Sequence, residues 1–260
     1  MGSVADKYIL YYHTGCSSCV RTKEFLLKSG VEFVAIDTLQ DPQGYEQLLQ
    51  LGVRYVPVVA KGKQFVRGQN LEDVAEFLGL HSSKQPLLVP EELISKWLRI
   101  LRTAHGYVNR IPDNSIELNA HPGRNRSIRM VSHHIFNIAE TFLDCVMKDG
   151  TKNLTEILEK PLKAGTYTTS EEIAHYGDEI VTRLERWWNA LADKSCRKDI
   201  NTFYKDRAIS MHQLLERSTW HSAHHARQIA DVLAHHGIDP GAGFTKEDLA
   251  GLPIPERLWD

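Results

Sequence analysis

The sequence predicts two folds in one chain: a small mixed α/β domain, followed by an all-α region. Short apolar runs alternate with amphipathic segments up to about residue 80, which indicates strands and helices in turn. Beyond residue 90, apolar residues recur at helical spacing in several long segments. The stretch between the two patterns contains two prolines. We therefore expect one domain over residues 1–82, a linker over 83–90 and a second domain over 91–260.

The composition limits the kinds of partner. The chain has 260 residues and a formal net charge of −2, so electrostatics give no reason to expect nucleic acid or a membrane surface as a partner. No apolar run approaches a membrane span, and no signal-peptide pattern opens the chain. Four cysteines are too few for a disulfide scaffold. We expect a cytoplasmic globular protein.

The first domain is predicted to follow the order strand, helix, strand, helix, strand, strand, helix. The expected ranges are 8–12, 17–29, 32–36, 42–51, 55–59, 63–66 and 71–78. Gly30 fits the end of the first helix, and Asp41-Pro42 supplies the cap and first-turn proline of the second. This order is typical of a thioredoxin-like fold.

Cys16 and Cys19 carry the predicted chemistry of this domain. A strand that leads into a helix through Cys-x-x-Cys places Cys16 at the helix start, where backbone N–H groups and the helix dipole favour a thiolate. Cys19 lies one turn further along and can form a disulfide with it. We expect Cys16 to attack and Cys19 to resolve. The alternatives are a structural metal site and two unrelated thiols. A zinc site needs four ligands, and no second cysteine pair has this spacing.

Residues 7–80 resemble a glutaredoxin. The resemblance is carried by the cysteine motif after the first strand and by two later pairs, Val56-Pro57 and Gly68-Gln69. It implies a thiol–disulfide oxidoreductase that binds glutathione. It also implies that the Val56 backbone pairs with the glutathione cysteine, that Pro57 is cis and faces Cys16, and that Gly68-Gln69 holds the γ-glutamyl end.

This sequence departs from the glutaredoxin pattern at two places. Ser17-Ser18 replaces the usual Pro-Tyr between the cysteines, and His13 stands where a basic lysine is common. The resemblance places His13 in the glutathione site. The two departures are expected to weaken or retune glutathione binding and to change the pKa of Cys16. The alternative for Pro57 is an ordinary proline at a strand edge.

The second domain is predicted to be a four-helix bundle. Amphipathic helices are expected over residues 91–108, 127–147, 170–191 and 207–236, with loops over 112–126 and 149–169. A short helix is expected over 246–250, in a tail rich in glycine and proline.

Histidines interrupt the apolar stripe of the last long helix. His221 and His225 are four residues apart, so they lie one above the other on the buried face. Two buried imidazoles are costly without partners, and a shared metal ion would satisfy both. The alternative is a pair of hydrogen-bonded core histidines. His224 points about 100° from His225 and is expected at the surface or in a supporting position.

A third ligand is expected from the helix over residues 127–147. His134 falls on its apolar stripe and is preferred to His133, which points partly away. Three histidines with an open position suit zinc best, with nickel, manganese and iron as alternatives.

Residues 90–240 resemble the DinB-like superfamily of metal-binding four-helix bundles. The resemblance is carried by His133-His134 and by Trp220-His221-x-x-x-His225-x-x-Gln228-Ile229. The family typically shows His-x-x-x-His-Arg-Gly-Gln, whereas Ala226-Arg227 stands here in place of Arg-Gly. The resemblance implies a metal site and, as in some members, transferase or isomerase chemistry on a low-molecular-weight thiol.

Together the two resemblances imply a glutathione-dependent metalloenzyme. It would transfer a thiol or isomerise a substrate at the three-histidine metal, while the glutaredoxin domain handles glutathione or its disulfides. Its partners would be glutathione and a small electrophile or disulfide. The alternative is a glutaredoxin-type oxidoreductase whose bundle only docks or senses, and a weaker one is a stress-related structural protein. Trp187-Trp188 would permit a homodimer, although a core position is the preferred interpretation.

Overall fold

The computed structural model describes residues 7–80, 88–121, 123–148, 162–163, 165–204 and 207–259. The chain forms two compact units, Met1–Pro86 together with Pro255–Asp260, and Leu87–Ile254. Residues 255–260 thus belong to the first unit, whereas the sequence predicted a second domain that runs to residue 260. Most of the predicted linker, residues 83–87, lies outside the described residues.

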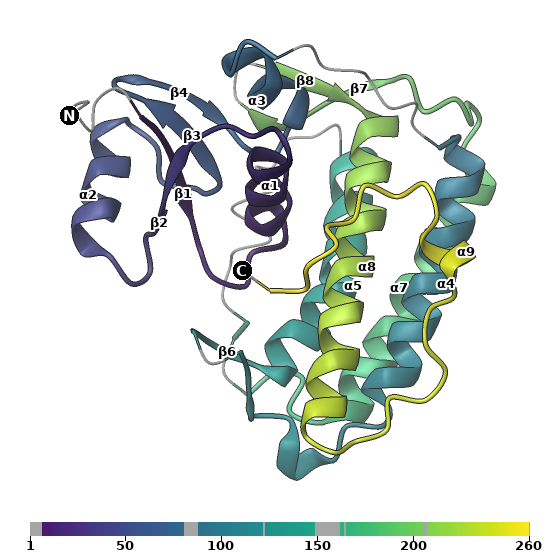
Figure 1. Cartoon of the computed structure of the whole chain (residues 1–260). Helices are drawn as coiled ribbons and strands as arrows, with labels where there is room; N and C mark the ends of the chain where they lie inside the picture. Colours follow the sequence, from purple (N-terminus) through teal and green to yellow (C-terminus); the bar gives the residue numbers. More distant parts are fainter. Residues whose placement is uncertain are drawn as a thin grey trace. The chain divides into compact units, whose positions relative to one another are not determined.

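The first unit has the thioredoxin-like order that the sequence predicts (Figure 1). Its four-stranded sheet has the order β2-β1-β3-β4, with β1 parallel to β2 and antiparallel to β3. Its elements are β1 (Tyr8–Tyr12), α1 (Ser17–Lys28), β2 (Phe33–Asp37), α2 (Pro42–Gln50), β3 (Val58–Lys61), β4 (Gln64–Arg67) and α3 (Leu71–Phe77).

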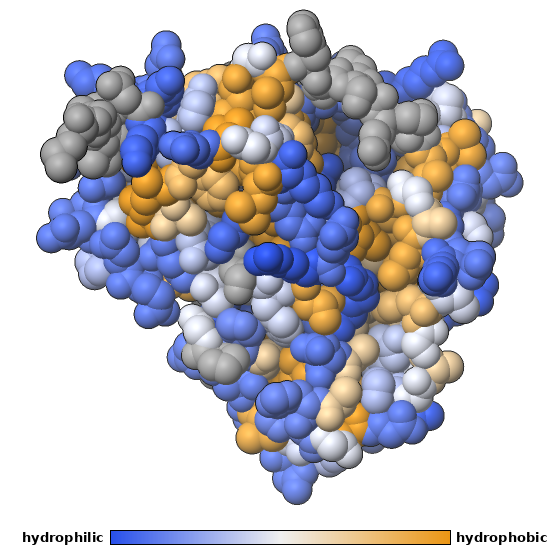
Figure 2. All heavy atoms as spheres, in the orientation of Figure 1, coloured by the Kyte–Doolittle hydropathy of each residue, from blue (hydrophilic) through white to orange (hydrophobic). Residues whose placement is uncertain are grey.

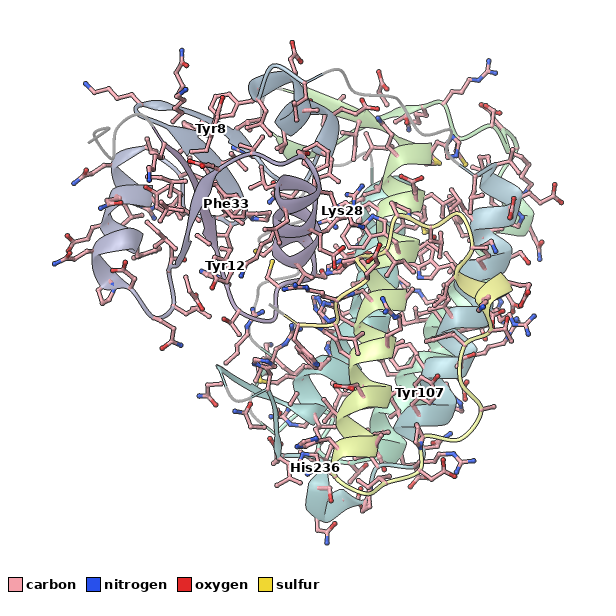
Figure 3. The ribbon with its side chains drawn as sticks, viewed as in Figure 1. Tyr8, Tyr12, Lys28, Phe33, Tyr107 and His236 are labelled. Carbon is pink, nitrogen blue, oxygen red and sulfur yellow. The ribbon has the colours of Figure 1, made fainter. Side chains whose placement is uncertain are left out.

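Side-chain alternation along β1 gives this unit a core on each face of the sheet. Leu10 packs with Leu26 of α1 and Val74 of α3. Its neighbour Tyr11 points to the other face and packs with Leu48 of α2. Figure 3 labels Tyr8 and Tyr12, at the two ends of β1, and Phe33, the partner of Tyr8 on β2.

One strand begins later than predicted. Residues 55–57 were expected to belong to the third strand, but β3 starts only at Val58. Pro57 has no backbone N–H to donate to a strand ladder, and its peptide bond with Val56 is cis, as the glutaredoxin resemblance implied.

The second unit is built from four long helices, as predicted (Figure 1). They are α4 (Pro90–Val108), α5 (Ile128–Met147), α7 (Ser170–Ala190) and α8 (Met211–His235), and the short α9 (Lys246–Leu249) follows. Both α8 and α7 pack against α4 and against α5, which closes the bundle. Trp97 of α4 donates to the Ser222 hydroxyl of α8 at 3.0 Å, and Ser222 donates to the Ile135 carbonyl of α5 at 3.1 Å.

Two β-hairpins correct the sequence prediction in this unit. The expected loop over 112–126 contains a 3-10 turn (Asp113–Ser115) and the hairpin β5 (Asn119–His121) to β6 (Arg124–Ser127). The helix expected from residue 207 starts only at Met211, because Arg207–Ser210 forms β8 against β7 (Asp199–Tyr204). Ser210 caps α8 with its hydroxyl, which accepts from the Gln213 backbone N–H. Much of the loop expected over 149–169 lies outside the described residues.

Within the described part of the chain, no helix combines the length and the apolarity that crossing a membrane requires. Figure 2 shows hydrophilic side chains over much of the visible face, with hydrophobic ones in separate patches between them.

Candidate functional sites

The cysteine pair lies at the start of α1, as the sequence predicts. Cys16 is the cap residue of the helix and is half-buried, whereas Cys19 is fully buried. The Cys19 backbone N–H points at the Cys16 sulfur, 3.3 Å away. A hydrogen bond from the backbone stabilises a thiolate more than a thiol. The more accessible sulfur is therefore also the one that the helix start supports as an anion.

The loop before the cysteines is held in place by polar contacts. Thr14 donates its hydroxyl proton to the Asp37 carboxylate at the end of β2, at 2.6 Å. The carbonyl of half-buried His13 accepts from the Cys16 backbone N–H at 3.2 Å. His13, which the sequence analysis placed in the glutathione site, thus fixes the cysteine turn through its backbone.

The two later motifs of the glutaredoxin resemblance meet beside the cysteine helix. The Gly68 N–H donates to the Pro57 carbonyl at 2.8 Å, and the Thr22 hydroxyl of α1 donates to the Gly68 carbonyl at 2.8 Å. A Cβ atom on Gly68 would lie 2.9 Å from both Pro57 and Thr22 side chains, so only glycine fits. Gln69 donates its amide N–H to the Val56 carbonyl at 3.2 Å.

The buried side-chain oxygen of Gln69, Oε1, is left as an acceptor without a hydrogen-bond partner. An acceptor of this kind, next to Val56 and Pro57, suits an N–H donor of a bound ligand. The structure brings these motif residues together, and glutathione binding by them stays a prediction.

Three histidines of the bundle converge. His134 of α5 and His221 and His225 of α8 are all buried, and their ligand nitrogens lie within 4.8 Å of one another. The Nε2 atoms of His221 and His225 are 3.2 Å apart. The ring of His134 packs edge-on against both, with centroid distances of 5.4 and 4.9 Å. These are the three residues that the sequence analysis selected.

The protonation state of this cluster suits a metal ion. Burial lowers the pKa of His134, His221 and His225 well below the ordinary value, so all three rings are neutral near pH 7. His225 donates its Nδ1 proton to the Gln228 side-chain oxygen at 2.7 Å. The Nε2 atom of His225 then carries no proton, and its lone pair is directed at the centre of the cluster.

The spacing also fits. Two nitrogens bound to one tetrahedral zinc at about 2.0–2.1 Å lie about 3.3 Å apart, close to the observed 3.2 Å. Without an ion, the Nε2 atom of His221 can donate to the Nε2 atom of His225. The buried Nδ1 atom of His221 has no hydrogen-bond partner in this structure. No aspartate or glutamate of the described residues joins this group of ligand atoms. The donor set is thus three neutral imidazoles, and it fits a divalent ion with open positions.

The neighbouring histidines lie elsewhere. His133 stacks on Tyr176 of α7 at 5.0 Å between centroids and also contacts Tyr167, which takes it out of the cluster. Burial lowers the pKa of His133 to about 4. His224 is fully buried in the bundle, which excludes the surface position and leaves the supporting position of the prediction. Its ring centroid lies 5.9 Å from that of His225.

Sequence reasoning gave Gln228 no role, although it was part of the quoted motif. Its position three residues after His225 puts both side chains on one helix face, and that spacing could have revealed it.

The fold and the cysteine pair define the class of the first unit as a thiol–disulfide oxidoreductase. A family model described as Glutaredoxin matches residues 8–66, and this part of the chain is a glutaredoxin domain.

A comparison with curated proteins found no similar sequence. Among solved structures, the chain is similar to YfiT from Bacillus subtilis, described as "a probable metal-dependent hydrolase with an unusual four-helix bundle topology". The identity is 15% and the TM-score 0.46, over 61% of this chain and 95% of that one. At this level of similarity, the chemistry of the bundle has to be inferred from its own side chains.

Proposed function

We propose that the chain is a glutathione-dependent metalloenzyme. The observation that carries this proposal is the convergence of His134, His221 and His225 in a chain whose first unit is a glutaredoxin domain. The reaction would be thiol transfer to a small electrophile, or isomerisation through a thiol adduct. The cysteine pair would reduce mixed disulfides of glutathione, which contain the S–S bond that a thiolate can attack.

The exchange step uses only groups of the first unit and glutathione. The Cys16 thiolate attacks the glutathione sulfur of a mixed disulfide, which forms a Cys16–glutathione disulfide and expels the other thiolate. Cys19 then attacks the Cys16 sulfur and releases glutathione, so the two electrons come from the cysteine pair. Two further glutathione molecules return the pair to the dithiol, forming glutathione disulfide. Buried Cys19 suits the second step because it meets only its neighbour.

In the bundle, the chain's own residues would hold and orient the ion. Three neutral imidazoles supply the ligands, and Gln228 fixes the ring of His225 in the tautomer that leaves Nε2 free. A divalent ion bound there would supply Lewis acidity and lower the pKa of a coordinated thiol or water. Zinc suits this donor set best, with nickel, manganese and iron as alternatives.

A second candidate function is an oxidoreductase whose bundle binds metal without catalysis. One observation favours it: among the described residues, no carboxylate lies within the cluster of ligand atoms to act as a general base. In that case the bundle would be a metal-dependent docking or sensing module without chemistry of its own, and all turnover would occur at Cys16.

The two functions predict different responses in one assay. Glutathione consumption should be followed with a panel of electrophiles and with a small disulfide, using metal-free, zinc-loaded and Cys16→Ser protein. Metal-dependent consumption of an electrophile that survives Cys16→Ser supports the metalloenzyme. Disulfide reduction that ignores metal and disappears in Cys16→Ser, with no electrophile consumed, supports the second function.

A further inference from the structure

The Val56 carbonyl lies close to the cysteine pair and outside the strand ladders. The pairing of β3 with β1 and with β4 begins at Val58, after the cis peptide bond. Val56 belongs to the core cluster that contains Cys19, and half-buried Cys16 packs against this cluster. A backbone acceptor that the sheet does not use is thus placed near the sulfur that is expected to attack.

The side chain of Gln69 occupies this acceptor. Its amide nitrogen donates to the Val56 oxygen at 3.2 Å. A carbonyl oxygen only accepts, so the nitrogen of the carboxamide, and not its oxygen, has to face Val56. Gln69 is half-buried, which places its side chain at the edge of the site. A ligand that needs the Val56 carbonyl therefore competes with Gln69.

The backbone on both sides of Gln69 is fixed, so its side chain is the part that can yield. Gly68 donates to the Pro57 carbonyl, and the Gly68 carbonyl accepts from α1. Asn70 caps α3, and its side-chain oxygen accepts from the Glu72 N–H at 3.0 Å. Rotation of one side chain is then enough to uncover the Val56 carbonyl, and the loop keeps its shape.

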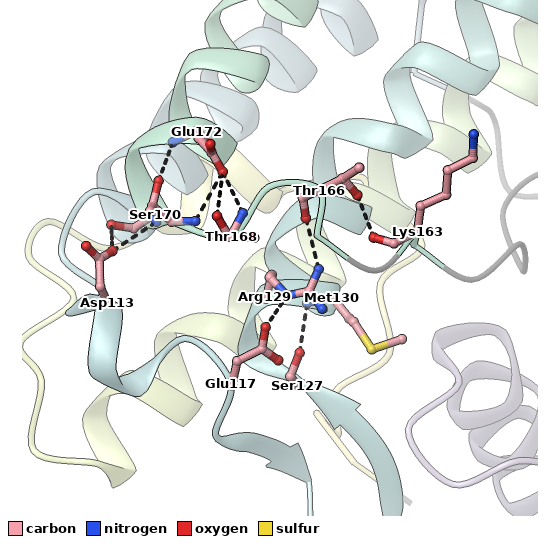
Figure 4. Close-up of polar contacts among 11 residues, drawn as sticks. Asp113, Glu117, Ser127, Arg129, Met130, Lys163, Thr166, Thr168, Ser170 and Glu172 are labelled. Atoms are coloured by element: carbon pink, nitrogen blue, oxygen red, sulfur yellow. Dashed lines mark hydrogen bonds and ion pairs between the residues drawn. The ribbon is translucent and has the colours of Figure 1, made fainter.

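The covered state leaves one polar atom unsatisfied. Elsewhere in the chain, side chains near a helix start find partners: Figure 4 shows Glu172 accepting from Thr168, and Asp113 accepting from Ser170. The buried Oε1 atom of Gln69 has no hydrogen-bond partner in this structure. An unsatisfied buried acceptor is costly, and outward rotation gives this oxygen water as a partner. This gain offsets the lost bond to Val56.

The covered acceptor suits a peptide disulfide. In a disulfide formed by a cysteine residue, the backbone nitrogen is three bonds from the sulfur. When Cys16 attacks that sulfur, the N–H of the ligand has to lie close to the backbone near Cys16, where Val56 offers a carbonyl. A small disulfide without an amide has no N–H to place there. Gln69 therefore opposes the first kind of ligand and not the second.

We propose that the Gln69 side chain is a displaceable cover on the Val56 carbonyl, which the N–H of a peptide disulfide such as that of glutathione replaces before Cys16 attacks. Gln69 thereby sets the selectivity of the exchange between disulfides with an amide N–H beside the sulfur and disulfides without one. This role rests on the thiol–disulfide exchange of the proposed function and assigns it a specificity-determining residue.

The test measures attack by the reduced full-length protein on N,N′-diacetylcystine and on 3,3′-dithiodipropionate. Both probes carry carboxylates, and only the first has amide groups. Each reaction oxidises the Cys16–Cys19 pair to a disulfide and releases the probe as two thiols. Acid quenching, alkylation and mass spectrometry follow the loss of protein thiols, and the dependence on probe concentration gives a half-saturation constant and a limiting rate.

Gln69→Ala should lower the half-saturation constant of N,N′-diacetylcystine about two- to tenfold, as expected for one hydrogen bond. Both limiting rates and the constant of 3,3′-dithiodipropionate should stay unchanged. Gln69→Glu keeps the size of the side chain but cannot donate when ionised, so the ratio of the two constants should shift as in Gln69→Ala. Gln43→Ala changes an exposed glutamine of α2 and should keep the wild-type ratio.

Two kinds of failure can be told apart. A wild-type ratio in Gln69→Ala or in Gln69→Glu, or a higher constant for N,N′-diacetylcystine in Gln69→Ala, would overturn the cover and leave the exchange reaction intact. Wild-type protein that is oxidised by neither probe nor by glutathione disulfide would overturn the exchange reaction itself, and the cover with it.

Discussion

At the scale of single residues, burial decides which of several similar groups can react. Among the cysteines, Cys16 is half-buried at a helix start, whereas Cys19, Cys145 and Cys196 are buried. Burial and nearby Asp193 raise the pKa of Cys196 to about 11, which keeps that thiol protonated. Reactivity should therefore concentrate at one sulfur.

Alkylation of the reduced protein at mildly acidic pH should modify Cys16 first. The reason is the accessible sulfur that accepts from the Cys19 N–H. Peptide mapping by mass spectrometry measures the order of labelling. Earlier labelling of Cys19 would reverse the two roles, and earlier labelling of Cys145 or Cys196 would remove the assignment.

Gln228→Ala should lower metal affinity about 10- to 100-fold, because the His225 ring loses the acceptor that fixes its tautomer. Competition with a chelator measures the affinity. Gln228→Glu keeps an acceptor at the same place and should stay close to wild type. Equal affinity in all three proteins would show that the contact does not support a ligand.

At the scale of elements, sequence patterns predicted long regular segments well and short irregular ones poorly. The seven elements of the first unit and the four bundle helices were predicted because apolar periodicity persists over several turns or a whole strand. The β5–β6 hairpin was missed because these two strands consist mostly of polar residues, such as Asn119, Arg124 and Arg126. Their pairing depends on neighbours that the local sequence does not reveal.

The start of α8 shows how a cap overrides a helical pattern. Ser210 and Gln213 form a capping box, so the chain before them pairs as β8. Ser210→Ala should destabilise the bundle by about 1 kcal/mol, while Ser210→Asn should cost less. Urea unfolding followed by the helical circular dichroism signal measures the difference. Equal midpoints for the two variants would contradict the role of the cap.

At the scale of the whole molecule, residues 255–260 belong to the unit in which the chain begins. The Glu24 carboxylate of α1 accepts from the backbone N–H groups of Glu256 and Arg257, at 3.0 and 2.6 Å. Lys28 of α1, labelled in Figure 3, pairs with Glu256 at 2.6 Å. No sequence pattern predicted these contacts, because they join residues more than 220 positions apart.

The metal-free bundle should lose stability as the pH falls below about 6.5, the ordinary histidine pKa. The pKa values of His134, His221 and His225 are lowered on folding, so the unfolded chain binds protons that the folded one refuses. Stability is then full above that pH and is lost toward the folded-state values. Thermal unfolding measured from pH 8 to pH 5 tests this. In His221→Ala, which lacks one buried ring, the unfolding temperature should fall less steeply with pH. A stability independent of pH would contradict the burial of neutral rings.

The most direct test of the central claim is the metal content of the purified full-length protein and of His134→Ala, His221→Ala and His225→Ala. Wild type should hold about one divalent ion per chain, since three neutral imidazoles complete one site. Each variant should lose the ion and any metal-dependent turnover, while disulfide exchange at Cys16 continues. Wild-type protein without a stoichiometric ion after metal-replete preparation, or variants that keep theirs, would contradict the account.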